Sequence, residues 1–311
     1  MKNKILATTI GVIVISLSLL VVGCKKTENA ENKFKIGFTN NDDANLFAKT
    51  QRDLFAATMK SDPTFEVVFT NGASDSQLQL DQIDNFIVQK VNAIVIRAVD
   101  YAGIVPGIEK ANKANIPVIS LGLDAGGGDF IWIGSKNYEA GKMQGEWLVE
   151  NLPANAKILY LSCVPGFTYS IERQEGLYDT LKTRSDITIL AEQTGNDQRI
   201  RGMQIMEDWL QSFPQFDAVV AANDEMILGA IEALKGANKL TSVITAGVDA
   251  TNDACIAVKN GELTFTVFQN SPALVVAAYD VCKRLQNGER IEKEIIVPFE
   301  LVTIENVDEY L

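Results

Sequence analysis

Acidic and amide side chains gather where the short apolar runs of this sequence end. In "FDAVVAANDEM" the apolar run from Phe216 to Ala222 gives way at once to Asn223, Asp224 and Glu225. Polar side chains at the end of a buried strand cost free energy unless something hydrogen-bonds to them, so we interpret this stretch as part of a ligand site. The side chains found after the other apolar runs, together with Arg173, are Asn40, Asn41, Asp42, Asp43, Arg97, Asp100, Ser120, Asp124, Phe167, Tyr169, Asn196, Asp197, Asp249, Gln269 and Asn270.

This combination of side chains suits a polyhydroxylated small molecule. Carboxylates and amides exchange hydrogen bonds with vicinal hydroxyls, an arginine fork bridges two oxygens, and aromatic faces cover the C–H face of a sugar ring. The sequence has no GxGxxG or GxxxxGK phosphate loop and no calcium-loop spacing of carboxylates. It also has no histidine, the commonest general base and metal ligand. These features disfavour nucleotide binding, a metal centre and catalysis, and no cofactor is expected.

The apolar runs predict an α/β fold with parallel sheets, because strands that are apolar at nearly every position belong to sheets covered on both faces. Between the runs, residues such as Leu80, Ile83 and Ile87 repeat at helical spacing. The alternation predicts right-handed βαβ units. The runs are "FKIGFT" (34–39), "FEVVFT" (65–70), "AIVIRA" (93–98), "PVISLG" (117–122), "KILYLS" (157–162), "FDAVVAA" (216–222) and "SVITAGV" (242–248).

The length of 311 residues favours two sheets over one, because single cores of this size tend to divide. A glycine-rich break, "LDAGGGDFIWIGSKN", precedes a helix expected from Tyr138 to Leu152. The segment 262–275 alternates apolar and polar residues and then turns into a helix at Ser271. Pro298 interrupts a final extended run, where a strand can leave one sheet and join another.

The N-terminal segment predicts export. Two lysines precede an uncharged apolar run from Ile5 to Val22, and Gly23 and Cys24 follow it. The run is long enough to span a bilayer as an uncleaved helix, which is one interpretation. In the other, the segment resembles a bacterial lipoprotein signal, residues 1–23 are removed, and Cys24 is acylated as a membrane anchor. Residues 24–33 are then a polar tether.

The net charge disfavours one class of binding partner, and the cysteine spacing gives no sign of a metal or redox motif. Removal of the two N-terminal lysines with the signal changes the formal charge from −12 to −14, which disfavours nucleic-acid binding through a basic face. Cys163, Cys255 and Cys282 have no CxxC spacing. They are interpreted as buried small hydrophobes, with one disulfide left open but no pair selected.

Eight motifs in order resemble the ribose/galactose-type periplasmic sugar-binding proteins of ABC importers. They are "KIGFTNNDDANLF", "AIVIRAVD", "ANIPVISL", "IGSKNYEAGKMQGEWL", "ERQEG", "AANDEMILGAIEAL", "AGVDAT" and "TVFQNS". The resemblance implies two Rossmann-like lobes (34–135 plus 270–298, and 136–269 plus 299–311) joined by three crossings near Ser135, Gln269 and Phe299. It further implies a monomer in the cell envelope that captures a sugar without catalysis and delivers it to ABC permease subunits.

The resemblance also assigns ligand-binding roles by position. Asn223, Asp249, Gln269 and Arg173 match polar sugar contacts, and Phe47 falls where aromatics stack on the ring. The remaining candidates are Asp43, Asp124, Phe167 and Asp197. The ribose-type Asp-Arg pair after the fourth strand is replaced by Gly122 and Leu123, which argues against ribose itself. Asp197 stands where glucose/galactose relatives place a stacking tryptophan, and their calcium loop is absent from "NLPANAKILY".

Structural alternatives exist for several of these residues. Asp224 or Asp249 could cap the helix that follows it. Arg173 could pair with Glu175, and Phe47 could belong to the core beside Leu54. For the whole protein, the alternatives are an exported chemosensory receptor of the same fold and a carboxylate-pair glycosidase. A repressor of related fold is excluded because no helix-turn-helix precedes Phe34.

Overall fold

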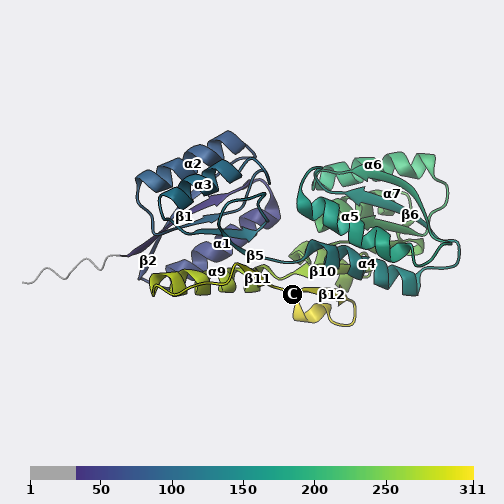
Figure 1. The fold of residues 1–311 in the computed structure, drawn as a ribbon. Helices are drawn as coiled ribbons and strands as arrows, with labels where there is room; N and C mark the ends of the chain where they lie inside the picture. The colour runs from purple at the N-terminus through teal and green to yellow at the C-terminus, as the bar shows by residue number, and fades with distance from the viewer. Residues whose placement is uncertain (1–32) are drawn as a thin grey trace, which may run out of the picture. The chain divides into compact units, whose positions relative to one another are not determined.

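The computed structural model describes residues 33–311, which form two six-stranded sheets with helices packed around each (Figure 1). The first sheet has the strand order β11-β5-β4-β3-β1-β2, and every neighbouring pair is parallel. Its strands are β1 (Phe34–Asn40), β2 (Phe65–Asn71), β3 (Ala93–Ile96), β4 (Val118–Gly122), β5 (Ile131–Gly134) and β11 (Glu294–Ile296).

The second sheet has the order β12-β10-β9-β8-β6-β7, and only β12, beside β10, runs antiparallel to its neighbour. Its strands are β6 (Lys157–Ser162), β7 (Thr188–Thr194), β8 (Ala218–Ala221), β9 (Ile244–Ala246), β10 (Phe265–Gln269) and β12 (Phe299–Thr303). The predicted fold class, two mostly parallel sheets flanked by helices, is confirmed.

Helices cover both faces of the first sheet. On one face lie α1 and α9 (Figure 1). They bury Phe55 and Leu274 in a core with Ile36 and Phe38 of β1. On the other face, α2 and α3 form a second core with β3 and β4. The helices around this sheet are α1 (Leu46–Lys60), α2 (Ser76–Val88), α3 (Val105–Lys113) and α9 (Ser271–Gln286).

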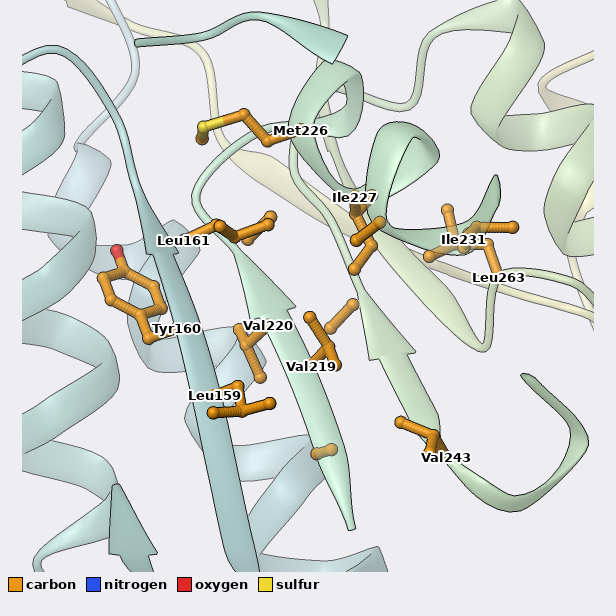
Figure 2. Close-up of a cluster of buried hydrophobic side chains, with 14 of the residues drawn as sticks. Leu159, Tyr160, Leu161, Val219, Val220, Met226, Ile227, Ile231, Val243 and Leu263 are labelled. Carbon is orange, nitrogen blue, oxygen red and sulfur yellow. The ribbon is translucent and has the colours of Figure 1, made fainter. Parts of the chain in front are cut away.

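The second sheet has one large core, and a smaller buried cluster of Ala140, Val248, Val267 and Phe299 lies beside β10 and β12. Figure 2 shows Leu159, Tyr160 and Leu161 of β6 beside Val219 and Val220 of β8, all fully buried. The helices around this sheet are α4 (Asn137–Asn151), α5 (Thr168–Leu181), α6 (Arg199–Ser212), α7 (Asp224–Gly236) and α8 (Asn252–Lys259), with short 3-10 turns η1 (Leu240–Ser242) and η2 (Val307–Glu309).

The chain passes between the two sheets three times. The passages lie between β5 and α4, between β10 and α9, and between β11 and β12. They lie near Ser135, Gln269 and Phe299. Two passages lie side by side, because the Val297 N–H donates to the Gly134 carbonyl at 2.9 Å.

All seven predicted apolar runs contain strands, but two further strands were not predicted. The glycine-rich break hides β5, which extends the first sheet rather than ending it. Strand β7 is an edge strand whose side chains are mostly half-buried or exposed, so it lacks the apolar pattern of a central strand.

The three cysteines of the described part of the chain are buried and free, so the disulfide left open by the sequence does not form there. Within residues 33–311, no helix has the length and apolar character needed to cross a membrane. The acylation site expected at Cys24 lies outside the described residues.

Candidate functional site

A cavity of about 820 Å³ lies at the carboxyl ends of strands from both sheets. This is where open α/β sheets bind their ligands. The predicted site residues that line it are Phe47, Phe167, Arg173, Asp197, Asn223, Asp249 and Gln269. The cavity therefore brings together seven of the nine predicted ligand-binding residues.

Arg173 is the centre of the wall formed by the second sheet. It lies on α5, where α4 approaches so closely that a Cβ on Gly141 would come within 1.8 Å of the Arg173 carbonyl oxygen. Its guanidinium is buried and uses every nitrogen. Nε donates to Asn137 Oδ1 at 3.0 Å, Nη1 to the Ala222 carbonyl at 2.7 Å, and Nη2 to Gln269 Oε1 at 3.2 Å. The alternative in which Arg173 pairs with Glu175 is wrong, because its acidic partner is the buried Asp249.

Asp249 supplies the negative charge beside Arg173, with 3.5 Å between Oδ1 and Nη1. Its backbone has φ +119°, an unusual value for a residue other than glycine, and its N–H donates to the Val267 carbonyl at 2.7 Å. The following helix is capped by Thr251, so Asp249 is not the cap. Burial raises the pKa of the Asp249 carboxyl, while Arg173 opposes that rise.

Two polar side chains after β8, Asn223 and Asp224, have different roles. Asn223 caps α7, because its Oδ1 accepts from the Met226 N–H at 3.0 Å, and it also lines the cavity. Asp224 is fully buried, and its carboxylate accepts from the Thr251 N–H at 2.7 Å and the Thr266 hydroxyl at 2.6 Å. Asp224 does not line the cavity, and the alternative that it caps the helix is wrong, because Asn223 is the cap; Asp224 joins α7 to the segments around β10.

An aromatic and acidic pair completes this wall. The Tyr169 hydroxyl donates to Asp197 Oδ2 at 2.5 Å, and the Phe167 ring lies 5.4 Å from that of Tyr169 between centroids. Oδ1 of Asp197 is buried and has no hydrogen-bond partner within the described chain.

The wall formed by the first sheet centres on a second buried arginine. Arg97 follows β3; its Nε donates to Asn41 Oδ1 at 3.3 Å and its Nη1 to Gln51 Oε1. The guanidinium carbon lies 5.8 Å from the centroid of the Phe47 ring. Phe47 is half-buried and lines the cavity, and it is not part of the core around Leu54.

Two predicted site residues lie elsewhere. Asp43 accepts from the Asn40 amide at 2.7 Å and pairs with Arg52, while its neighbours Asp42 and Ala44 line the cavity. Asp124 lines an adjoining cavity of about 410 Å³, which shares Leu123 and Asn137 with the main cavity. The main cavity does not include Asp43 or Asp124.

Several residues of the lining were not among the predicted contacts, and four of them carry polar groups discussed above. These four are Asn41, Arg97, Asn137 and Tyr169. Asn41, Arg97 and Tyr169 follow apolar runs, so their position at strand ends was a usable signal. Asn137 opens α4 after the first passage between sheets, and no local pattern marks it. Among residues 33–311, no group of three cysteine, aspartate or glutamate side chains is arranged to hold a metal ion.

Comparisons with known proteins match this fold and site. The profile of the family described as periplasmic binding protein domain matches residues 36–290. A Rhizobium meliloti protein named as rhizopine-binding is 34% identical over 245 residues, covering 76% of this chain and 79% of its own length. The ribose import binding protein of Bacillus subtilis is 29% identical over 239 residues, covering 76% of this chain and 77% of its own.

A solved structure gives the same result. An ABC transporter solute-binding protein from Bacillus halodurans with bound myo-inositol has a TM-score of 0.85 and 34% identity, covering 91% of this chain and 98% of its own. These homologues are binding proteins of transport systems, not enzymes. The chain therefore belongs to the periplasmic binding protein family, in its ribose/galactose type.

Proposed function

We propose that this protein captures a sugar or cyclitol in the 820 Å³ cavity and delivers it to an ABC importer. The observation that carries the proposal is the pair of buried arginines, Arg97 and Arg173, on opposite walls of a cavity lined by acids, amides and aromatic rings. Such a lining offers donors and acceptors to many hydroxyls at once. The ligand-binding residues are taken to be the seven that line the cavity.

The mechanism we propose is closure of two lobes around the ligand. The lobes are 34–135 plus 270–298, and 136–269 plus 299–311, and the three passages between them act as the hinge. A ligand that contacts both walls stabilises the closed arrangement by its differential affinity for it. The closed form is then the one that the permease subunits recognise. The protein acts as a monomer.

The ligand class can be tested by thermal unfolding of the purified protein against pentoses, hexoses, inositols and polyols, with myo-inositol and ribose included. We expect one compound to raise the midpoint by several degrees, since a ligand at about a hundred times its Kd adds roughly 2.7 kcal/mol of stability. Co-purified ligand is removed beforehand by unfolding and refolding. A refolded protein that responds to no member of the panel would contradict a sugar or cyclitol ligand.

We also propose that the mature chain lies outside the cytoplasm and is anchored to a membrane of the cell envelope by a lipid on Cys24, as the apolar run and "GCKK" favour. In cells, Cys24→Ser is expected to abolish incorporation of a labelled fatty acid and to move the protein out of the membrane fraction. Cys282→Ala, in the buried face of α9, is the control and should leave both unchanged. Persistent labelling of Cys24→Ser would show that the lipid is attached elsewhere or that the assignment is wrong.

A further inference from the structure

We propose that Arg97 determines the specificity of the site by donating from Nη2 to neighbouring hydroxyls of an uncharged cyclic polyol. The inference rests on the proposed function and adds to it the group that selects the ligand. Arg97 lies immediately after β3, is 4% exposed, and lines the cavity. Its counterpart on the opposite wall, Arg173, has all three nitrogens engaged by the protein.

The guanidinium of Arg97 is held in place but is only partly used. Nε donates to Asn41 Oδ1, and Nη1 donates to Gln51 Oε1 and, at 3.5 Å, to the Leu121 carbonyl. Nη2 has no hydrogen-bond partner within residues 33–311. It is also not fully buried. Two N–H donors on a fixed guanidinium are therefore directed to an accessible part of the cavity, where a ligand with adjacent oxygens can satisfy both.

Gly122 makes room for this guanidinium. The residue ends β4 with φ +78°, a conformation that favours glycine, and a Cβ built there would lie 2.6 Å from Arg97 Nη1 and 3.2 Å from Gln51 Oε1. Any side chain at position 122 would displace the arginine. Gly122 at the end of β4 thus leaves the space that the guanidinium of Arg97, after β3, occupies.

The charges around the cavity indicate that the ligand is neutral. Within residues 33–311, Arg97 pairs with no carboxylate, and its acceptors there are amide and carbonyl oxygens. Burial lowers its pKa to about 10, so it remains charged at neutral pH. The charged residues of the lining are four acids and three arginines, namely Asp42, Asp197, Glu225, Asp249, Arg97, Arg173 and Arg199. A lining without excess positive charge favours an uncharged polyol over an acidic sugar.

The test measures coupling between Arg97 and single hydroxyls. Calorimetric titrations would use refolded wild type, Arg97→Met and Arg97→Lys with myo-inositol, its monodeoxy analogues, D-ribose and D-glucuronate. Both substitutions are expected to weaken binding of the neutral ligand that wild type prefers by about tenfold to a hundredfold. Wild type should bind the deoxy analogue that lacks the contacted hydroxyl more weakly than myo-inositol, by a similar factor. Arg97→Met should bind the two ligands with nearly equal affinity, because the contact is already lost.

Arg184→Met is the matched control. Arg184 donates to the Val149 and Leu152 carbonyls and lies outside the cavity, so its replacement should leave the affinities for all of these ligands unchanged. Arg97→Lys keeps a buried cation, so it provides a second test of the contact if Arg97→Met does not fold. Equal affinity of wild type and both Arg97 variants, unchanged deoxy penalties, or preference of wild type for glucuronate would overturn the inference while leaving the proposed function intact. A wild type that binds none of these ligands would overturn both.

Discussion

Replacing Arg173 with methionine is expected to abolish measurable ligand binding and to lower the free energy of unfolding by about 3 kcal/mol. The side chain is 4% exposed and is the only cation that pairs with Asp249 within residues 33–311. Its removal leaves a buried carboxylate and two amide oxygens, those of Asn137 and Gln269, without their donor. The loss of binding should exceed a hundredfold, since several hydrogen bonds fail together.

The position of Arg173 explains why both effects are expected from one residue. Asn137 follows the first passage between the sheets, Gln269 precedes the second, and Phe299, which follows the third, has its ring centroid 5.9 Å from the guanidinium carbon. One guanidinium therefore contacts a residue beside each passage while lining the cavity. We therefore expect a ligand that contacts Arg173 to change the conformational preference of all three passages together.

Urea unfolding and calorimetric titration with the ligand found in the panel would measure the two effects. Arg184→Met serves again as control, because Arg184 also donates to backbone carbonyls, of Val149 and Leu152, but lies outside the cavity. Arg173→Lys should recover part of the stability and little of the binding, since the single ammonium nitrogen cannot replace donors that the guanidinium places on three separate nitrogens. An Arg173→Met protein that binds within threefold of wild type would contradict the assignment of Arg173 to the ligand site.

The sequence predicted the sheets well because parallel strands buried on both faces carry a strong local signal. The strands it missed are those where the signal is weak: β7 at an exposed edge, and β5 after three consecutive glycines. Polar residues at strand ends were likewise visible in the sequence, because the carboxyl ends of parallel strands meet at one edge.

The individual roles of the polar residues were harder to predict, since each depends on partners far along the chain. Asp43 looked like a ligand contact, but Arg52 and Asn40 engage it. Arg97 was noted at a strand end, yet its importance depends on a glycine 25 positions later whose missing side chain leaves space for the guanidinium. Neither fact follows from local spacing.

Asp224 shows the same limit, and its replacement is the second large effect expected. Asp224→Ala should lower the free energy of unfolding by about 2–4 kcal/mol, because the Thr251 N–H and the buried Thr266 hydroxyl lose their acceptor. Asp224→Asn should cost less, since an amide can accept from the N–H and donate to the hydroxyl oxygen. Glu207→Ala, at an exposed position on α6, is the control and should change stability by less than about 0.5 kcal/mol.

The pH dependence distinguishes a buried carboxyl from a simple hydrogen-bond acceptor. Burial, followed by repulsion from Asp249, raises the pKa of Asp224 well above its usual range. The folded chain therefore keeps a proton that the unfolded chain loses above about pH 4, so this residue's contribution to stability falls as the pH rises from there toward the folded pKa. Urea unfolding of wild type and Asp224→Asn at pH 5 and pH 8 should show a smaller advantage for wild type at pH 8. An advantage that grows with pH would mean that the folded state prefers the charged carboxylate, and Asp224 would then act chiefly as an ionised acceptor for Thr251 and Thr266.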